Sequence, residues 1–466
     1  MRRCLTLLAL ALLMPLLPCG RVLRADEDPA ARKARAAAEE ARLARERAVL
    51  DERVAKAIER GTAWLQRQQR PDGSYPGFAD RLDPNAYNPM DVGLNALVML
   101  TLAHGGLAPE HDAVKKCMRF CQFHYAGGNG SWNLKGNGTL TVYSAAVLVL
   151  ALDALYRGAE GKPPPVRRDR YGEGEPPKPV RCKYPDSVRK WIVELVEFIV
   201  GCQHETGGWR YPGNPVASEP GDTDLSNTQY ALLALEAAAR SGIAVPPATF
   251  EKAAAHALGE QEQEGLEAPV WQPDEAWLPG DPPERRFRQV ARVEARGWTY
   301  LPGHASLPTG SMTTAGVAVL AICKERLWAL ERLPIDLRKR LDRGLRDGVT
   351  WLGEHFAVDT NPDQQPQWHY YYLYGLERAG TKLGLAWLGT HDWYREGAEH
   401  LLAAQQADGG WLEAAASGKP ADSTESAITQ TCFALLFLKR ATRVPPVPLA
   451  PPAAVTGEGG APAEGR

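Results

Sequence analysis

The chain has 466 residues, and its 54 Lys and Arg side chains nearly balance 56 Asp and Glu, which gives a formal net charge of −2 at pH 7. This balance lacks the basic footprint of a nucleic-acid-binding protein, so no nucleic-acid partner is expected. The 8 cysteines form no CxxC pair and no dense framework, which excludes a fold organised by disulfides. The sequence indicates neither a metal site nor another cofactor.

The N-terminal residues 1–25 are typical of a signal peptide. Two arginines precede the apolar run Leu5–Leu17, and Ala25 is a small residue suited to cleavage. The run is too short to span a bilayer, and no later stretch is long and apolar enough to do so. We therefore expect an exported protein, periplasmic or extracellular, without a transmembrane span in its mature chain. Cys19 leaves lipid anchoring open, although Pro18 stands where a small residue is expected.

Residues 26–53, rich in Ala, Arg and Glu, predict a charged and solvated helical arm. After them, amphipathic stretches alternate with stretches that are apolar on nearly all sides, as expected for outer and inner helices. The amphipathic stretches lie near 54–69, 112–125, 186–204, 248–264, 340–356 and 394–406, and the apolar ones near 91–104, 140–157, 224–241, 312–330, 368–379 and 424–441.

A turn built from glycine and an aromatic residue recurs after the amphipathic stretches. One helical hairpin cannot bury its own apolar face, so six such units predict a closed ring. We predict an all-α fold, an (α/α)6 toroid of six helical hairpins over residues 54–441. The pattern Q-x-x-x-G-x-aromatic occurs at Gln69–Tyr75, Gln203–Trp209 and Gln405–Trp411, with looser versions at Gly130–Trp132, Gly297–Trp298 and Trp368.

Several predicted inner helices end in a cation followed by glycine, as at Arg240–Gly242 and Arg378–Gly380. Glycine supplies a left-handed C-terminal cap there, and the cation complements the helix dipole. Three segments fall outside the predicted helices: an exposed Pro-rich insertion at 158–185, a long loop at 265–296 expected over one mouth of the ring, and a disordered tail at 442–466.

The turn and the helix before it resemble the QW repeat of squalene and oxidosqualene cyclases. The first copy reads Arg60–Gly61–x–x–Trp64–Leu65–x–x–x–Gln69–x–x–x–Gly73–x–Tyr75, and further copies lie at 397–411, 198–209 and, in part, 348–352. The resemblance covers about residues 54–441 and points to the α-α toroid superfamily of terpenoid cyclases and protein prenyltransferases. It implies a central cavity that binds an isoprenoid-type ligand.

The chain keeps only part of the motif on which cyclase chemistry depends. Squalene–hopene cyclases protonate a polyene with the middle Asp of D-x-D-D-T, and the matching stretch here is Asp224–Leu225–Ser226–Asn227–Thr228. Ser226 stands in the place of the proton donor, and a serine hydroxyl is far too weak an acid to protonate an alkene. Asp222 could stand in only if the loop shifted by two residues.

Two other branches of the superfamily match less well. Protein prenyltransferases hold a catalytic zinc with Asp, Cys and His, but His369 lies one residue out of register with the zinc His and the D-x-C step has no counterpart. A thioester domain needs G-C-G-E-Q, and the stretch Ala257–Gln261 has no Cys. The resemblance therefore implies no metal and no thioester.

In such a ring the N-termini of the inner helices line one mouth, where we expect the site. The Ser and Asp candidates could instead cap the helices, and the turn tryptophans could be wedges between repeats. The aromatic cluster at 367–374 is denser than one buried face requires. The predicted catalytic residues are Asp224, Asp222 and His369, and the predicted ligand-binding residues are Trp298, Tyr300, Trp368, Tyr371, Trp411, Ser226, Asp422 and Glu425.

Three functions stay open. The first is an exported cyclase-like toroid that binds a hydrophobic isoprenoid-type ligand, with catalysis undecided because of Ser226. The second is a polysaccharide-active enzyme that uses Tyr, His and carboxylates. The third is a non-catalytic scaffold for a protein partner. An apolar sealed cavity would favour the first, an open polar cleft the second, and a filled centre with an apolar outer patch the third.

Overall fold

The computed structural model describes residues 28–76, 89–125, 140–157, 184–211, 223–301, 307–363, 368–412 and 427–440. The predicted signal peptide, the C-terminal tail and nearly all of the Pro-rich insertion lie outside these residues. Within them the chain forms twelve α-helices, one short 3-10 helix (Pro283–Arg285) and a two-stranded sheet.

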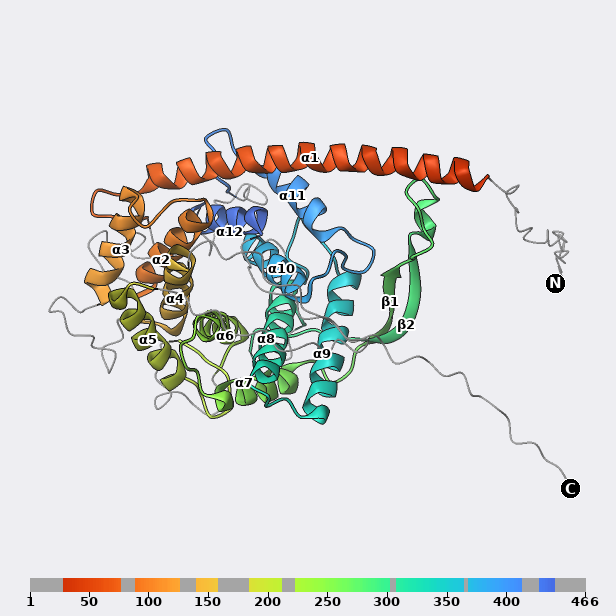
Figure 1. The fold of residues 1–466 in the computed structure, drawn as a ribbon. Coiled ribbons are helices and arrows are strands. Elements are labelled where there is room, and N and C mark those ends of the chain that lie inside the picture. Colours follow the sequence, from red (N-terminus) through yellow and green to blue (C-terminus); the bar gives the residue numbers. More distant parts are fainter. Residues whose placement is uncertain are drawn as a thin grey trace, which may run out of the picture.

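Six inner helices follow one another around an axis, and six outer helices cover them (Figure 1). Each inner helix packs against the next, and the last packs against the first, so the inner layer is closed. The predicted all-α (α/α)6 toroid is therefore confirmed. The inner helices are α2 (Pro89–His104), α4 (Val142–Tyr156), α6 (Leu225–Arg240), α8 (Gly310–Ala329), α10 (His369–Leu383) and α12 (Ala427–Lys439). The outer helices are α1 (Pro29–Gln68), α3 (Asp112–Tyr125), α5 (Asp186–Gly201), α7 (Pro247–Glu260), α9 (Ile335–Glu354) and α11 (Trp393–Ala404).

Each glutamine of the recurring turn ties one outer helix to the next. The Gln203 side-chain amide donates to the carbonyl oxygen of Gly207 in its own turn (2.9 Å) and to that of Thr249 at the start of α7 (3.0 Å). The side-chain amide thus holds its own turn and adds a second hydrogen bond to a carbonyl group of the next outer helix. The same pair of bonds joins Gln69 to Gly73 and Ala113, and Gln405 to Gly409 and Ala57.

The glycine of the last turn closes the ring. Gly409 has a φ of +102°, a region that favours glycine, and a Cβ there would lie 2.7 Å from the backbone oxygen of Arg60 in α1. Gln405 reaches the same helix through the carbonyl oxygen of Ala57, at 2.9 Å. The sixth repeat is thus joined to the first by the contact that joins the others.

The aromatic residue of the turn fills the space between an inner and an outer helix. The Trp411 indole is fully buried, and its Nε1 donates to the carbonyl oxygen of Leu401 in α11 (2.8 Å). Its backbone N–H donates to the Thr431 hydroxyl in α12 (3.0 Å). Equivalent bonds join Trp209 to Ile199 and Thr228, and Trp298 to Ala257 and Thr313.

The segment predicted as a long loop is instead an antiparallel hairpin of β1 (Leu266–Pro273) and β2 (Phe287–Ala295). Both strands pack against α9 on the outer side of the ring, away from the axis (Figure 1). The strands carry a mixture of exposed and half-buried side chains without regular alternation. The expectation that this segment covers a mouth is therefore wrong.

The hairpin interrupts a fourth copy of the turn. Gln261 donates to the carbonyl oxygen of Arg296 (3.1 Å) and to that of Gly344 in α9 (3.0 Å), as the other glutamines do in their turns. Arg296 thus takes the glycine's place, two residues before Trp298. The two halves of the motif lie on either side of the inserted strands.

Helix α1 is one uninterrupted helix of 40 residues, so the predicted arm and the first outer helix are continuous. At 1.5 Å per residue it is about 60 Å long. Its N-terminal half runs past the ring toward the tip of the hairpin (Figure 1). There Arg32 and Arg35 form ion pairs with Asp281, at 2.7 and 2.9 Å. The hairpin therefore braces the arm.

Candidate functional site

The start of α6 carries the stretch that aligns with the cyclase acid motif. Asp224 caps the helix: its two oxygens accept from the backbone N–H and the side-chain amide of Asn227, at 2.7 and 2.8 Å. Burial raises the pKa of Asp224 to about 6, although the bonds from Asn227 oppose this shift. Asp224 is thus a buried cap with both oxygens engaged as acceptors.

A chain of hydrogen bonds crosses from α6 to α10. The Ser226 hydroxyl lies 3.0 Å from the Tyr371 hydroxyl, which donates to the Gln229 side-chain oxygen (3.2 Å). The same oxygen accepts from the Arg378 guanidinium at 3.0 Å. Ser226 and Gln229 lie one turn apart on one face of α6, and Tyr371 and Arg378 lie two turns apart on one face of α10. The two helices therefore face each other across the axis.

An aromatic layer surrounds this chain and draws on four inner helices. Tyr143 of α4 lies 4.5 Å from Tyr230 of α6, measured between ring centroids, and Tyr230 is stacked on Tyr371 at 6.2 Å. Tyr371 meets Phe433 of α12 edge-on at 5.6 Å, and Tyr374 is stacked on the same ring. We call these five residues the aromatic layer.

Three partly exposed aromatic side chains form a rim above the aromatic layer. The Trp368 ring, 39% exposed, meets Tyr371 edge-on at 6.4 Å, and its backbone has a φ of +60°, which is strained for tryptophan. Tyr300 is 41% exposed, and its carbonyl oxygen accepts from the first N–H of α6. Burial and the nearby carboxylate of Asp224 raise the pKa of the Tyr300 hydroxyl to about 12. Tyr211 lies in the same group, with its pKa raised by burial and by Asp224.

A charged layer lies further along the same two helices. Lys382 of α10 and Glu236 of α6 form a fully buried ion pair. Glu325 of α8 lies beside them, and burial together with the charge of Glu236 raises its pKa. The three contacts between α6 and α10 follow one another in the same order along both helices, so the two helices run in the same direction. The wall facing the axis is thus aromatic and polar, where an apolar one was expected.

The structure brings together only some of the residues that the sequence predicted for one site. Ser226, Asp224, Tyr371, Trp368 and Tyr300 do come together at the N-terminal ends of α6 and α10. Asp222, Asp422 and Glu425 lie outside the described residues.

Three predicted site residues lie away from this mouth. Trp298 and Trp411 are fully buried wedges between helices, so they have a packing role instead of contacting a ligand. The His369 ring faces outward: its Nε2 lies 2.9 Å from the carbonyl oxygen of Val358, and its ring meets His400 of α11. These contacts hold the His369 ring on the side of α10 that faces α11, whereas Asp224 caps α6.

Sequence reasoning missed the residue at the centre of the ring. Arg378 was predicted to end a helix with Gly380, but α10 continues to Leu383, and Gly384, with a φ of +63°, is its left-handed cap. Gly380 instead makes room for the Trp393 ring in α11. The signal was the spacing of Tyr371, Tyr374 and Arg378, which puts a cation on the aromatic face of the helix.

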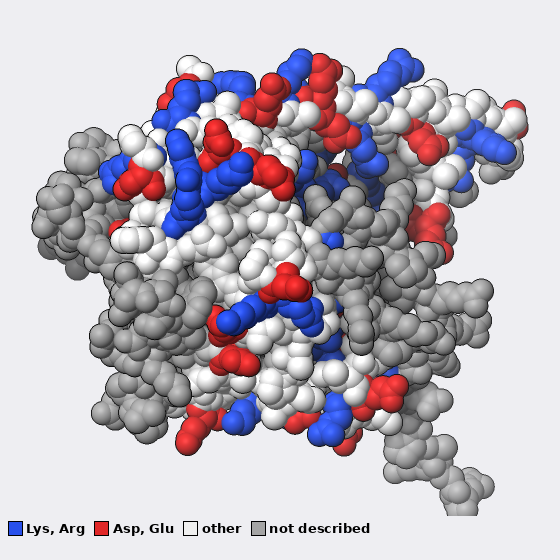
Figure 2. All heavy atoms as spheres, turned by 60° about the vertical axis from the view of Figure 1, so that its left-hand side comes forward, with Lys and Arg blue, Asp and Glu red and all other residues white. Residues whose placement is uncertain are grey.

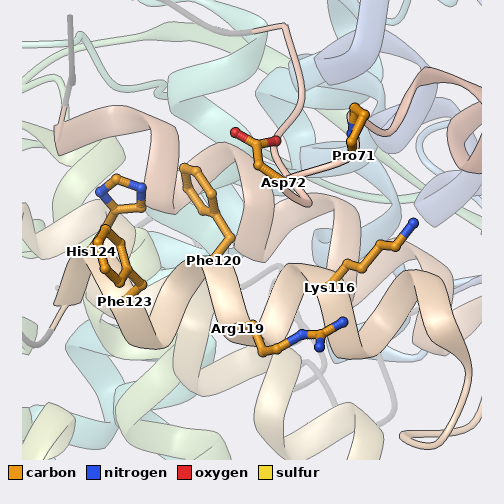
Figure 3. A pocket seen from close by; sticks show the side chains of 7 residues that line it. All are labelled: Pro71, Asp72, Lys116, Arg119, Phe120, Phe123 and His124. Carbon is orange, nitrogen blue, oxygen red and sulfur yellow. The ribbon is translucent and has the colours of Figure 1, made fainter. Parts of the chain in front are cut away.

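A recess lies on the outer surface, between the first turn and α3. It has a volume of about 470 Å³. On the face drawn in Figure 2 the positive and negative side chains are interspersed, without an extended region of one sign. Figure 3 shows Phe120, Phe123 and His124 toward one end of the recess and Lys116 and Arg119 toward the other. We call this recess the outer groove.

Among the described residues, no three His, Cys, Asp or Glu side chains converge in a way that could hold a metal ion. None of the described helices combines the length and apolar character needed to cross a bilayer.

Comparison with known proteins gives a distant structural similarity. No protein-family model matches the chain, and no curated protein matches its sequence. Among solved structures, two variants of the type II terpene cyclase MstE from Scytonema, each in complex with geranylgeranyl dihydroxybenzoate, are 11% identical and have a TM-score of 0.45. The apo form of the same cyclase is 10% identical with a TM-score of 0.43. Each comparison covers 84% of this chain and 98% of the other. These values are too low to assign an activity to the chain.

Proposed function

We propose that this chain is an exported toroid that binds an isoprenoid-type ligand at the mouth formed by the N-terminal ends of α6 and α10. The observation that carries the proposal is the aromatic layer beneath a partly exposed aromatic rim. Small-molecule sites combine aromatic walls with a few polar groups that fix orientation. Here Ser226 and Tyr371 supply such groups next to aromatic faces.

The chemistry of the rim indicates the chemical class of the ligand. The side chains of Trp368 and Tyr300 are partly exposed and offer broad apolar faces. A branched hydrocarbon chain packs on such faces without hydrogen bonds. A sugar would require several hydroxyl partners, and Asp224, the carboxylate described at this mouth, already accepts two bonds from Asn227. These observations favour an isoprenoid chain over a polysaccharide.

We propose that the chain binds its ligand and that Asp224 does not initiate polyene cyclisation. Alkene protonation needs a carboxylic acid aimed at the ligand, whereas Asp224 faces Asn227 and the donor's place holds Ser226. A carbocation formed in the aromatic layer would also meet the Arg378 guanidinium, which lies 4.1 Å from the centroid of the Tyr374 ring. Like charges at such range are unfavourable in a buried site.

The test is equilibrium binding of radiolabelled geranylgeraniol to the purified mature chain. Wild type should bind, and Trp368→Ala should weaken the affinity about fivefold, because an aromatic contact contributes about 1 kcal/mol. Trp387→Ala is the matched control, since that ring stacks on Arg286 beside the hairpin. Absence of binding, or equal effects of the two substitutions, would remove the mouth as the site. Export predicts that the mature protein begins near Asp26, which N-terminal sequencing determines.

A further inference from the structure

The Arg378 guanidinium is buried at the centre of the ring, and no carboxylate of the described residues pairs with it. The side chain is 1% exposed, and its Nε and Nη1 have no hydrogen-bond partner. Its contacts are the Gln229 oxygen and the faces of three tyrosines, whose ring centroids lie 4.1 to 5.8 Å away. A buried cation is costly unless it is paired.

Several other cations with little exposure lie beside carboxylates. Lys382, one turn further along α10, pairs with Glu236, and Arg157 pairs with Asp153 in α4. Arg296 pairs with Asp347 at 2.6 Å, and the buried Arg326 lies near the charges of Glu325 and Glu236. Among the described residues, Arg378 differs from these cations because no carboxylate faces its guanidinium.

The guanidinium is aimed toward the mouth. Side chains on a helix slope toward its N-terminus, so Arg378 reaches back from the body of α10 toward Gln229 and Tyr371. The hydrogen-bond chain continues through the Tyr371 hydroxyl to Ser226, which is partly exposed. Burial raises the pKa of Tyr371, so its hydroxyl stays protonated. Its proton is donated to Gln229 in this structure, and turning the hydroxyl toward Ser226 would let it donate to an anion at the mouth.

Resting on the proposed function, we infer that the ligand carries an anionic head, a carboxylate or a phosphate, that seats on the Ser226 and Tyr371 hydroxyls above Arg378. The hydroxyls supply hydrogen bonds, and the guanidinium supplies the charge through a low-dielectric layer of tyrosine rings. The isoprenoid chain then lies against Trp368 and Tyr300 at the rim. The ligand class is an acidic isoprenoid amphiphile.

Three probes with the same C20 chain separate the head from the tail: geranylgeraniol, geranylgeranoic acid and geranylgeranyl diphosphate. At least one acid should bind wild type about tenfold more tightly than the alcohol, and which acid does so distinguishes a carboxylate from a phosphate. Arg378→Gln should abolish this preference and leave the affinity for the alcohol within about twofold. Arg378→Lys, which keeps the charge, should restore part of it.

Two further variants make the result specific. Tyr371→Phe keeps the ring and removes the hydroxyl, so it should weaken binding of the acid more than binding of the alcohol and thereby reduce the preference. This variant also serves as the test if circular dichroism shows that Arg378→Gln fails to fold. Arg119→Gln in the outer groove is the matched control and should change nothing.

Each outcome bears on one of the two proposals. Equal affinity for acids and alcohol in wild type overturns the anionic head and leaves the proposed function standing. A preference that survives both Arg378→Gln and Tyr371→Phe, or one that Arg119→Gln abolishes, also overturns it. If no C20 probe binds, the proposed function fails as well.

Discussion

Substituting the glycine that closes the ring separates two sources of strain. In Gly409→Ala the new Cβ must accept a φ of +102° and lie 2.7 Å from the backbone oxygen of Arg60, where ordinary contacts begin at 3.4 Å. A side chain at positive φ costs about 1–2 kcal/mol. Overpacking against a helix backbone that cannot move adds about 1–3 kcal/mol. We expect a loss of about 2–5 kcal/mol in the free energy of unfolding.

Two other glycines serve as controls for the backbone strain and for the overpacking. Gly106 has a φ of +97° with no atom within 4 Å of a built Cβ, so Gly106→Ala should cost only the backbone strain, about 1–2 kcal/mol. Gly259 lies in α7 with an ordinary φ and open space, so Gly259→Ala should stabilise by about 0.5–1 kcal/mol. Urea unfolding followed by tryptophan fluorescence measures all three. Equal losses in Gly409→Ala and Gly106→Ala would refute the argument that close approach to α1 closes the ring.

Three other predictions concern the buried Asp224 carboxylate, the Gln405 hydrogen bonds and the Asp281 ion pairs. The pKa of Asp224 is raised from 3.8 to about 6 in the folded state, so the folded state binds more protons than the unfolded state between these pH values. Wild-type stability should therefore fall as pH rises from about 4 through 6. In pH-dependent urea unfolding, Asp224→Asn should flatten this slope and raise the free energy of unfolding at pH 7 by about 2–3 kcal/mol. Gln405→Leu removes the two hydrogen bonds that the side-chain amide donates to Ala57 and Gly409 and should cost about 1–3 kcal/mol in the same unfolding assay. A change below about 0.5 kcal/mol would show that these bonds are unimportant. Asp281→Asn removes the ion pairs to Arg32 and Arg35, so hydrogen exchange should accelerate in the N-terminal half of α1 while the unfolding midpoint of the ring stays within error; protection that does not change would contradict the brace.

Much of the ring could be predicted from the sequence because its determinants are local. The spacing of apolar residues sets which helices are inner, and three of the turns carry their glutamine, glycine and aromatic residue within seven positions. The end of α10 was misplaced because Gly380 looks like a cap, whereas it packs against Trp393 and the left-handed residue is Gly384. A glycine that serves close packing and one that serves a positive φ look the same in a sequence.

The centre of the site could not be predicted because it depends on contacts across the axis. Periodicity shows that Gln229 and Arg378 each lie on a buried face, but it does not show that these faces meet 149 positions apart. The role of Asp224 likewise depends on contacts that the sequence does not show. Asp224 was identified as a catalytic candidate and as a helix cap, and only its bonds to Asn227 show that it caps α6.

The interrupted turn has a consequence for how the fourth junction assembles. From the glutamine to the residue in the glycine's place, the separation is four positions in the other turns, but it is 35 positions from Gln261 to Arg296. Loop-closure entropy grows as (3/2)RT ln n, so bringing these ends together costs about 2 kcal/mol more than in an uninterrupted turn. Pairing of Leu266 with Ala295 at the base of the hairpin shortens the effective loop and offsets much of that entropy. The paired strands thus hold the two ends of the interrupted turn together, and a flexible linker of equal length in their place would weaken the junction between α7 and α9.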